Sequence, residues 1–117
     1  MPNSNSVMIH RLQKAINTKF EEKLLLNRRQ WYSEKEHRPI TVYIISKAIY
    51  DDDTKKTKSN ELFSSTSELQ IVLFLRDYWY TLNGWEVPTD NEEWNKAKAL
   101  YYSRVAKGAN AWEVEDC

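Results

Sequence analysis

Few residues of this 117-residue chain have the types and spacings that chemistry requires. Asp51, Asp52 and Asp53 are adjacent carboxylates, and clustered carboxylates are what hard cations prefer. They lack the alternating ligand spacing and the glycine of a calcium loop, so we interpret them as a solvated hairpin tip. His10 and His37 are the imidazoles available for acid–base catalysis, and neither lies in a recognisable nucleophile motif. We therefore predict no catalytic residue, no bound metal and no cofactor.

Composition excludes several further classes. One cysteine rules out a disulfide framework and, with two histidines, an ordinary structural zinc site. Two glycines argue against a phosphate-binding loop, which needs flexible backbone close to its ligand. No apolar run approaches the roughly 20 residues of a membrane-spanning helix. The sequence predicts a cytoplasmic protein that does not contact a membrane.

Basic and aromatic side chains are interleaved around one predicted strand and turn. This basic–aromatic cluster consists of Arg28, Arg29, Trp31, Tyr32, Lys35 and Arg38. Guanidinium groups suit phosphate contacts, and aromatic rings suit base stacking. Residues 1–58 hold 12 Lys+Arg and 7 Asp+Glu, a net charge of +5, whereas residues 59–117 hold 5 and 10, a net charge of −5. The cluster is a candidate surface for nucleic acid or another anionic partner, unless its arginines pair with Glu34, Glu36 and the acidic second half.

Hydrophobic periodicity predicts one α+β domain, a three-stranded antiparallel sheet with helices packed on it in the order α-β-β-β-α-α. The first helix spans about residues 7–19, and the strands span residues 24–32, 40–50 and 60–65, with a charged loop from Asp51 to Ser59. A central helix follows, in which Ser65 and Glu68 have capping-box spacing and Gly84 ends the helix. A last helix completes a domain over residues 7–107, between a flexible stretch (1–6) and a loose acidic tail (108–117).

The central helix carries apolar side chains on two sides. The main stripe consists of Ile71, Phe74, Leu75, Tyr78, Trp79 and Leu82. A second stripe of Leu69, Leu73 and Tyr80, with Arg76 among them, lies on the opposite side. Such a helix is either enclosed by the fold or offers one side to a partner. The second stripe is therefore the candidate protein-contact surface, covered either by the last helix, through Trp94 and Tyr101, or by another chain.

Two resemblances extend this interpretation. Four segments look like parts of small uncharacterised proteins of phages and integrative elements of Gram-positive bacteria: Gln30–Ser33, Glu61–Phe63, Phe74–Trp79 and Gly84–Asn91. The order α-β-β-β-α over residues 7–83 is also similar to that of a double-stranded-RNA-binding domain. Such domains place a lysine cluster at the start of their final helix. The corresponding segment of this chain, Ser65–Gln70, contains no lysine. The first resemblance implies a mobile-element setting. Compact proteins from such elements often act by binding a host or element-encoded protein, including as inhibitors of defence nucleases.

The sequence thus favours a small non-enzymatic protein-binding module, a regulator or inhibitor whose partner is another protein. The alternative is a nucleic-acid-binding accessory protein that uses the basic–aromatic cluster. The oligomeric state is left open.

Overall fold

The computed structural model describes residues 4–106 of the chain. Six elements follow one another: α1 (Ser4–Phe20), β1 (Leu24–Ser33), β2 (Arg38–Asp51), β3 (Lys56–Ser65), α2 (Glu68–Leu82) and α3 (Glu92–Ala106). The three strands form one antiparallel sheet in the order β1-β2-β3. This arrangement confirms the predicted α+β fold and its element order. The predicted tail, residues 108–117, lies outside the described residues.

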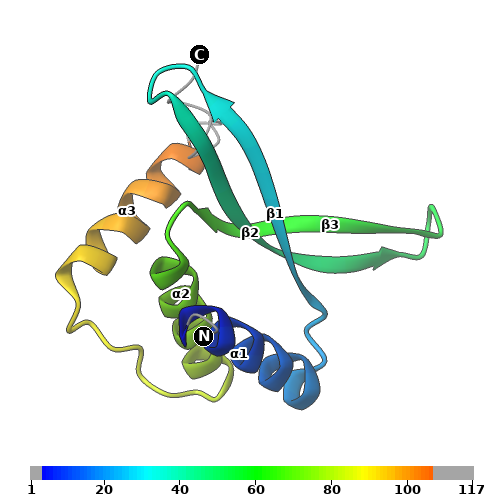
Figure 1. Ribbon diagram of the computed structural model, residues 1–117. Coiled ribbons are helices and arrows are strands. Elements are labelled where there is room, and N and C mark those ends of the chain that lie inside the picture. The colour runs from blue at the N-terminus through cyan, green and yellow to red at the C-terminus, as the bar shows by residue number, and fades with distance from the viewer. Residues whose placement is uncertain (1–3, 107–117) are drawn as a thin grey trace.

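β2 is the central strand. Its first residues extend beyond β3 and its last residues extend beyond β1. Residues 38–47 of β2 pair with β1, and residues 43–51 pair with β3. The register with β3 shifts between Ile45 and Ser46. Because such a bulge bends a strand and increases its twist, the two hairpins project in different directions (Figure 1).

The β2–β3 hairpin is longer than the sequence predicts. β3 begins at Lys56, so the turn occupies only residues 52–55, and the predicted loop from Asp51 to Ser59 is wrong. Residues 56–61 are all exposed, as are Ile49 and Tyr50 on β2. A ribbon exposed on both faces has no alternation of apolar and polar side chains, and that alternation is the signal that identifies strands in a sequence.

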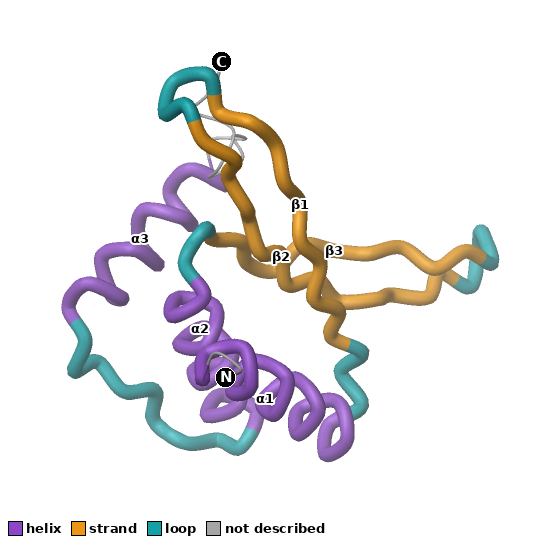
Figure 2. The backbone as a smooth tube through the Cα atoms, viewed as in Figure 1, coloured by secondary structure: helices purple, strands orange, loops and turns teal. Residues whose placement is uncertain are grey.

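The helices enclose the core on one face of the sheet. α1 and α2 lie side by side there, whereas α3 stands farther out, beside β3 (Figure 2). Phe63 of β3 is 1% exposed, and its ring centroid lies 5.0 Å from that of Phe74, 5.4 Å from Trp94 and 4.7 Å from Tyr101. The other buried members of this core are Ile9, Ile16, Leu24, Ile45, Ile71 and Leu75. The predicted main stripe of α2 is thus confirmed as core.

The ends of α2 are capped by local side chains. Ser67 is the N-cap, and its hydroxyl accepts the Gln70 N–H at 3.4 Å. The predicted capping box of Ser65 and Glu68 is therefore wrong. The Ser65 hydroxyl instead donates to Oε1 of Gln70 at 2.7 Å, which ties the end of β3 to the first turn of α2. Gly84 takes a left-handed φ of 74° beyond the last turn, as predicted.

Candidate interaction surfaces

Three sides of α2 are packed against other elements. The side with Phe74 faces the sheet and the core. On the α1 side, the Trp79 ring meets the Phe20 ring edge-on at 5.7 Å. On the α3 side, Asp77 accepts the indole N–H of Trp94 at 2.8 Å. The fourth side lies between the α1 side and the α3 side, opposite Phe74, and we call it the outer face of α2. It consists of Leu69, Leu73, Arg76 and Tyr80.

The outer face of α2 is apolar and partly open to water. Leu69 is 50% exposed, and Leu73 and Tyr80 are partly buried. The Tyr80 ring meets the ring of Trp85 edge-on at 5.4 Å, and Trp85 is itself 53% exposed. The structure thus places all the residues of the predicted protein-contact surface on one side of one helix.

The predicted cover of this face by the last helix, through Trp94 and Tyr101, is partial. Leu73 packs against the core cluster that includes both residues, whereas Leu69 stays 50% exposed. Trp94 and Tyr101 point into the core, where they are 2% and 6% exposed and contact Phe63. The hydrogen bond from Trp94 to Asp77 attaches the indole to the α3 side of α2. α3 therefore covers the outer face of α2 only in part.

Asp77 is a buried carboxylate that sequence reasoning missed. It is 8% exposed, and its Oδ2 accepts from Nε1 of Trp94 at 2.8 Å and from Nζ of Lys98 at 3.0 Å. Its Oδ1 accepts from Nη2 of Arg76 at 3.1 Å. Buried charges need partners of this kind, so the network joins α2 to α3. No local pattern in the sequence identifies this network, because it depends on where α3 packs.

The same network holds the guanidinium of Arg76 in place on the outer face of α2. The guanidinium of Arg76 is bound through both Nε and Nη2 to Asp77, and the Arg76 side chain is still 25% exposed. An arginine held in this way loses little further freedom when it binds a partner.

β1 divides the basic–aromatic cluster between the two faces of the sheet. Successive side chains of a strand point to opposite faces. Arg28 and Tyr32 share the face of α1 and α2, where Arg28 lies opposite Tyr43 of β2. Arg29 and Trp31 lie on the other face. One flat ligand cannot contact all four side chains from one side.

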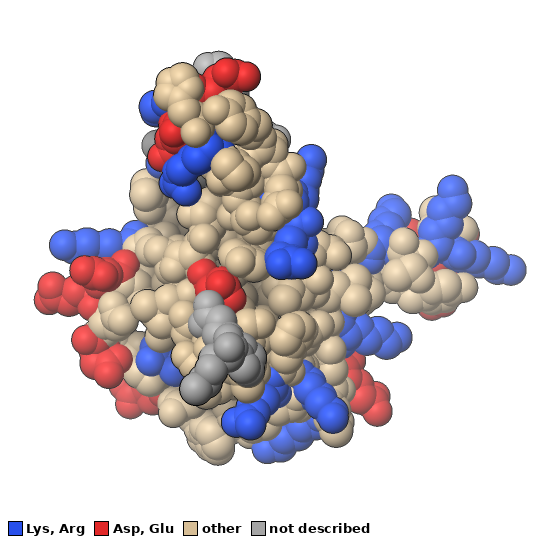
Figure 3. Space-filling view, viewed as in Figure 1, with Lys and Arg blue, Asp and Glu red and all other residues tan. Residues whose placement is uncertain are grey.

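The rest of the cluster lies at the β1–β2 turn, among charges of both signs. Lys35 is an exposed residue of the turn, and Nη2 of Arg38 lies 3.3 Å from Oε2 of Glu36. In Figure 3, Lys and Arg are distributed over α1, β1 and the β2–β3 hairpin, and Asp and Glu gather near the beginning of α3. The cluster is therefore not a continuous basic patch.

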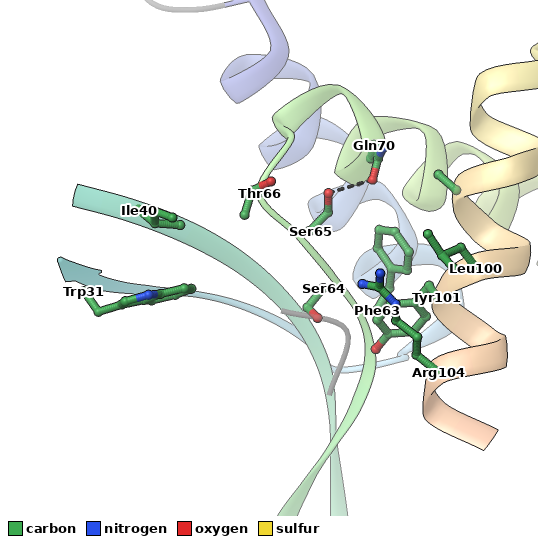
Figure 4. Close-up of a pocket in the computed structure, with 11 residues that line it drawn as sticks. Trp31, Ile40, Phe63, Ser64, Ser65, Thr66, Gln70, Leu100, Tyr101 and Arg104 are labelled. Atoms are coloured by element: carbon green, nitrogen blue, oxygen red, sulfur yellow. Dashed lines mark hydrogen bonds between the residues drawn. The ribbon is translucent and has the colours of Figure 1, made fainter. Parts of the chain in front are cut away.

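A pocket of about 180 Å³ lies between the sheet and α3 (Figure 4). Trp31 and Ile40 line it from the sheet, and Leu100 and Arg104 line it from α3. Ser65, with its hydrogen bond to Gln70, closes the side nearest α2. The pocket combines an aromatic ring, aliphatic side chains and a guanidinium group.

Two tyrosines donate hydrogen bonds to carboxylates of other elements. The Tyr78 hydroxyl donates to Oε1 of Glu22 at 3.2 Å, and Nζ of Lys47 lies 2.6 Å from Oε2 of the same residue. Burial, reinforced by the charge of Glu22, raises the pKa of Tyr78 to about 12. The Tyr101 hydroxyl donates to Oε2 of Glu61 at 2.6 Å, and burial and this carboxylate together raise the pKa of Tyr101 well above its usual range.

We expect the free energy of unfolding to fall as the pH rises above about 10. In the unfolded chain these tyrosines ionise near pH 10, whereas in the folded chain Tyr78 keeps its proton until about pH 12. Between these two pH values the unfolded state binds fewer protons than the folded state, so alkali favours unfolding. The stabilisation that the protonated tyrosine gives the folded state is fully present below pH 10 and is lost as the pH rises towards 12. Urea unfolding near pH 8 and near pH 11 measures the effect. A double variant, Tyr78→Phe with Tyr101→Phe, should lose most of this pH dependence; an unchanged dependence would contradict the assignment.

Within residues 4–106, no three His, Asp or Glu side chains come together as metal ligands. Asp51 accepts the Asp53 N–H at 3.0 Å and lies 3.8 Å from Nζ of Lys58, as expected of a hairpin tip. His10 is exposed on α1, and His37 lies in the β1–β2 turn. In the same part of the chain, every helix is too short or too polar to cross a membrane.

The chain matches no family model, no curated protein and no solved structure. The geometry of its surfaces therefore carries the argument for function.

Proposed function

We propose that this protein is a small non-enzymatic protein-binding module whose contact surface is the outer face of α2. One observation carries the proposal: Leu69 is half exposed on a helix whose other three sides pack against α1, α3 and the sheet. An apolar side of a central helix that remains open to water is typical of an interaction site.

The residue types on the outer face of α2 support this proposal. Tyrosine and arginine are the residues that, with tryptophan, most often dominate binding energy at protein interfaces. Tyr80 is supported by Trp85 and Arg76 by Asp77, so both side chains are positioned before a partner arrives. A preordered surface binds with a smaller loss of conformational entropy.

The alternative function, nucleic-acid binding, has less support. The basic–aromatic cluster is divided between two faces of β1, and Arg38 pairs with Glu36. The net charge of the whole chain is zero, whereas most nucleic-acid-binding domains are basic.

We further propose that the partner is a host protein, such as a defence nuclease, which this module regulates or inhibits in the cytoplasm on behalf of a phage or mobile element. The support is the sequence resemblance. Two of its segments, Phe74–Trp79 and Gly84–Asn91, include Arg76 on the outer face of α2 and Trp85 beside it.

The variant Leu69→Glu should abolish partner capture and leave the fold intact. A glutamate in the first turn of a helix is favourable, and Leu69 contributes little buried area, so the free energy of unfolding should change by no more than about 0.5 kcal/mol. A buried charge at the interface should weaken binding at least about tenfold. The matched control is Leu25→Glu on β1, because Leu25 is 43% exposed and distant in the sequence. Affinity capture from a host lysate with the tagged wild type and both variants provides the comparison; equal capture by all three would refute the assignment of this face.

A further inference from the structure

β1 is an edge strand of the three-stranded sheet. Among the residues that the structure describes, it pairs with β2 alone, so one of its two hydrogen-bonding edges faces away from the sheet. Such an edge is a row of backbone N–H and C=O groups, and the row is a template for an added strand. α1 lies next to the beginning of this outer edge, where two of its side chains form hydrogen bonds with Leu24.

The contacts of Leu24 show which residues of β1 direct their backbone groups to the outer edge. The Leu24 N–H donates to Oδ1 of Asn17 at 2.8 Å, and the Leu24 carbonyl accepts from Nδ2 of Asn17 at 3.1 Å. Both groups of Leu24 therefore point away from β2. The pairing of β1 with β2 runs without a shift, and in such a strand successive residues alternate between its two edges. The backbone groups of Leu26 and Arg28 therefore also lie on the outer edge, whereas those of the residues in between face β2.

The outward groups of Leu26 and Arg28 lie beside a pocket and are open. In the described part of the chain, Asn17 satisfies Leu24, but no residue forms a hydrogen bond with the backbone groups that Leu26 and Arg28 direct outwards. A pocket of about 490 Å³ lies between this part of β1 and α1. Backbone groups need hydrogen-bond partners, and here the fold supplies none. This stretch of edge therefore has both the free groups and the space for one more extended chain.

The charges around this pocket favour an acidic occupant. Arg28 and His10 both line the pocket and are exposed, and within residues 4–106 neither takes part in an ion pair. The described residues that line the pocket include no acidic side chain. Glu68 of α2 acts on the same group of side chains, but its carboxylate already accepts the Tyr43 hydroxyl. Arginine binds carboxylates through two parallel hydrogen bonds, so Arg28 can hold an acidic side chain of an incoming chain.

We propose that an extended acidic segment of a partner protein adds to β1 as a fourth strand, beside Leu26 and Arg28 and next to α1. A peptide backbone supplies both donors and acceptors to this edge, whereas the phosphates of a nucleic acid supply acceptors only. The residues opposite Leu26 and Arg28 are two positions apart and point to the same side of the sheet. The segment should therefore have an acidic residue opposite Arg28 and an apolar residue opposite Leu26. This site shares no residue with the outer face of α2, so it does not depend on the function proposed above.

Amide hydrogen exchange of the full chain tests the geometry of this edge. We expect the N–H groups of Leu26 and Arg28 to exchange at least about tenfold faster than those of Leu25 and Asn27, because only the latter two face β2. Equal protection of all four amides in dilute protein would overturn the proposal, because the outer edge would already be covered. Protection of Leu26 and Arg28 that appears only as the protein concentration rises would identify a second copy of this chain as the added strand, and would equally overturn it.

A capped synthetic peptide, Thr-Val-Thr-Asp-Thr-Val-Thr, is the probe for strand addition. Its aspartate has a valine two positions away on either side, so the pattern fits a strand added in either direction. At about 1 mM the peptide should slow amide exchange at Leu26 and Arg28 at least about fivefold. A peptide with proline in place of both valines should have no effect, because proline lacks the N–H that pairs with the edge. Unchanged exchange with the valine peptide would overturn the proposal, as would protection by a single-stranded DNA oligonucleotide in its place.

Reversal of the charge of Arg28 makes the test specific. Arg28→Glu should bind the aspartate peptide at least about fivefold more weakly, and should prefer the same peptide with lysine in place of aspartate, because opposite charges across a strand pair attract and like charges repel. The matched control is Lys56→Glu, which makes the same change of charge at an exposed residue of β3 and should bind like the wild type. If Arg28→Glu still prefers the aspartate peptide, the acidic residue does not lie opposite Arg28 and the proposal fails.

Discussion

Phe63→Ala should destabilise the domain by about 3–5 kcal/mol, the largest effect that we expect of any single substitution. Phe63 is 1% exposed and contacts aromatic rings from both α2 and α3. Its removal leaves a cavity at the point where the sheet and these two helices meet, and rigid neighbouring rings fill such a cavity poorly. Domains of this size are stable by about 5–15 kcal/mol, so the variant should lose a large part of its stability.

Equilibrium unfolding in urea measures this loss for Phe63→Ala. Tyr50→Ala is the matched control, because it also removes an aromatic ring from a strand but at a residue that is 55% exposed. We expect the control to lie within about 0.5 kcal/mol of the wild type. Equal stability of the two variants would show that Phe63 is not the centre of the core.

Asp77→Ala should destabilise the protein by about 3 kcal/mol and should release α3 from α2. The substitution leaves the indole N–H of the buried Trp94 without its acceptor and removes the counter-charge of Lys98. Arg76 and Lys98 are about one quarter exposed and can turn towards water, so we expect the lower end of the range for broken buried ion pairs.

Hydrogen exchange separates this local effect from general destabilisation. Amides of α3 should exchange faster in Asp77→Ala by a larger factor than amides of β2 and α1, because α3 is attached largely through side chains. Asp90→Ala, an exposed acidic residue just before α3, is the control and should leave exchange in α3 unchanged. An equal acceleration of hydrogen exchange in all elements would contradict the attachment of α3 to α2 through Asp77.

Most of the fold could be predicted from periodicity, because its core obeys simple repeats. The β-branched run from Ile40 to Ile45 predicts a strand, and the stripe through Phe74 predicts the buried side of α2; both are confirmed. The outer half of the β2–β3 hairpin, from Lys56 onward, was missed because neither of its faces is buried. The cap of α2 was misplaced because Ser65 and Ser67 both have suitable side chains, and the sequence alone does not determine where β3 ends.

The candidate surfaces were predictable only in part. Helical spacing brings Leu69, Leu73, Arg76 and Tyr80 to one side of α2 in any helix, so this surface followed from the sequence. The period of a strand separates Arg28 from Arg29, so the division of the basic–aromatic cluster could have been predicted from alternation alone. The Asp77 network and the pocket beside Trp31 could not, because both depend on where α3 packs, and no local pattern specifies that position.

The most direct test of the account is capture from a nuclease-treated host lysate with the wild type, Leu69→Glu and Leu25→Glu. If the protein binds another protein through the outer face of α2, a partner should be captured by the wild type and by Leu25→Glu after nuclease treatment, and Leu69→Glu should lose it. If the partner disappears after nuclease treatment, or if Leu69→Glu still captures it, the proposed function is contradicted.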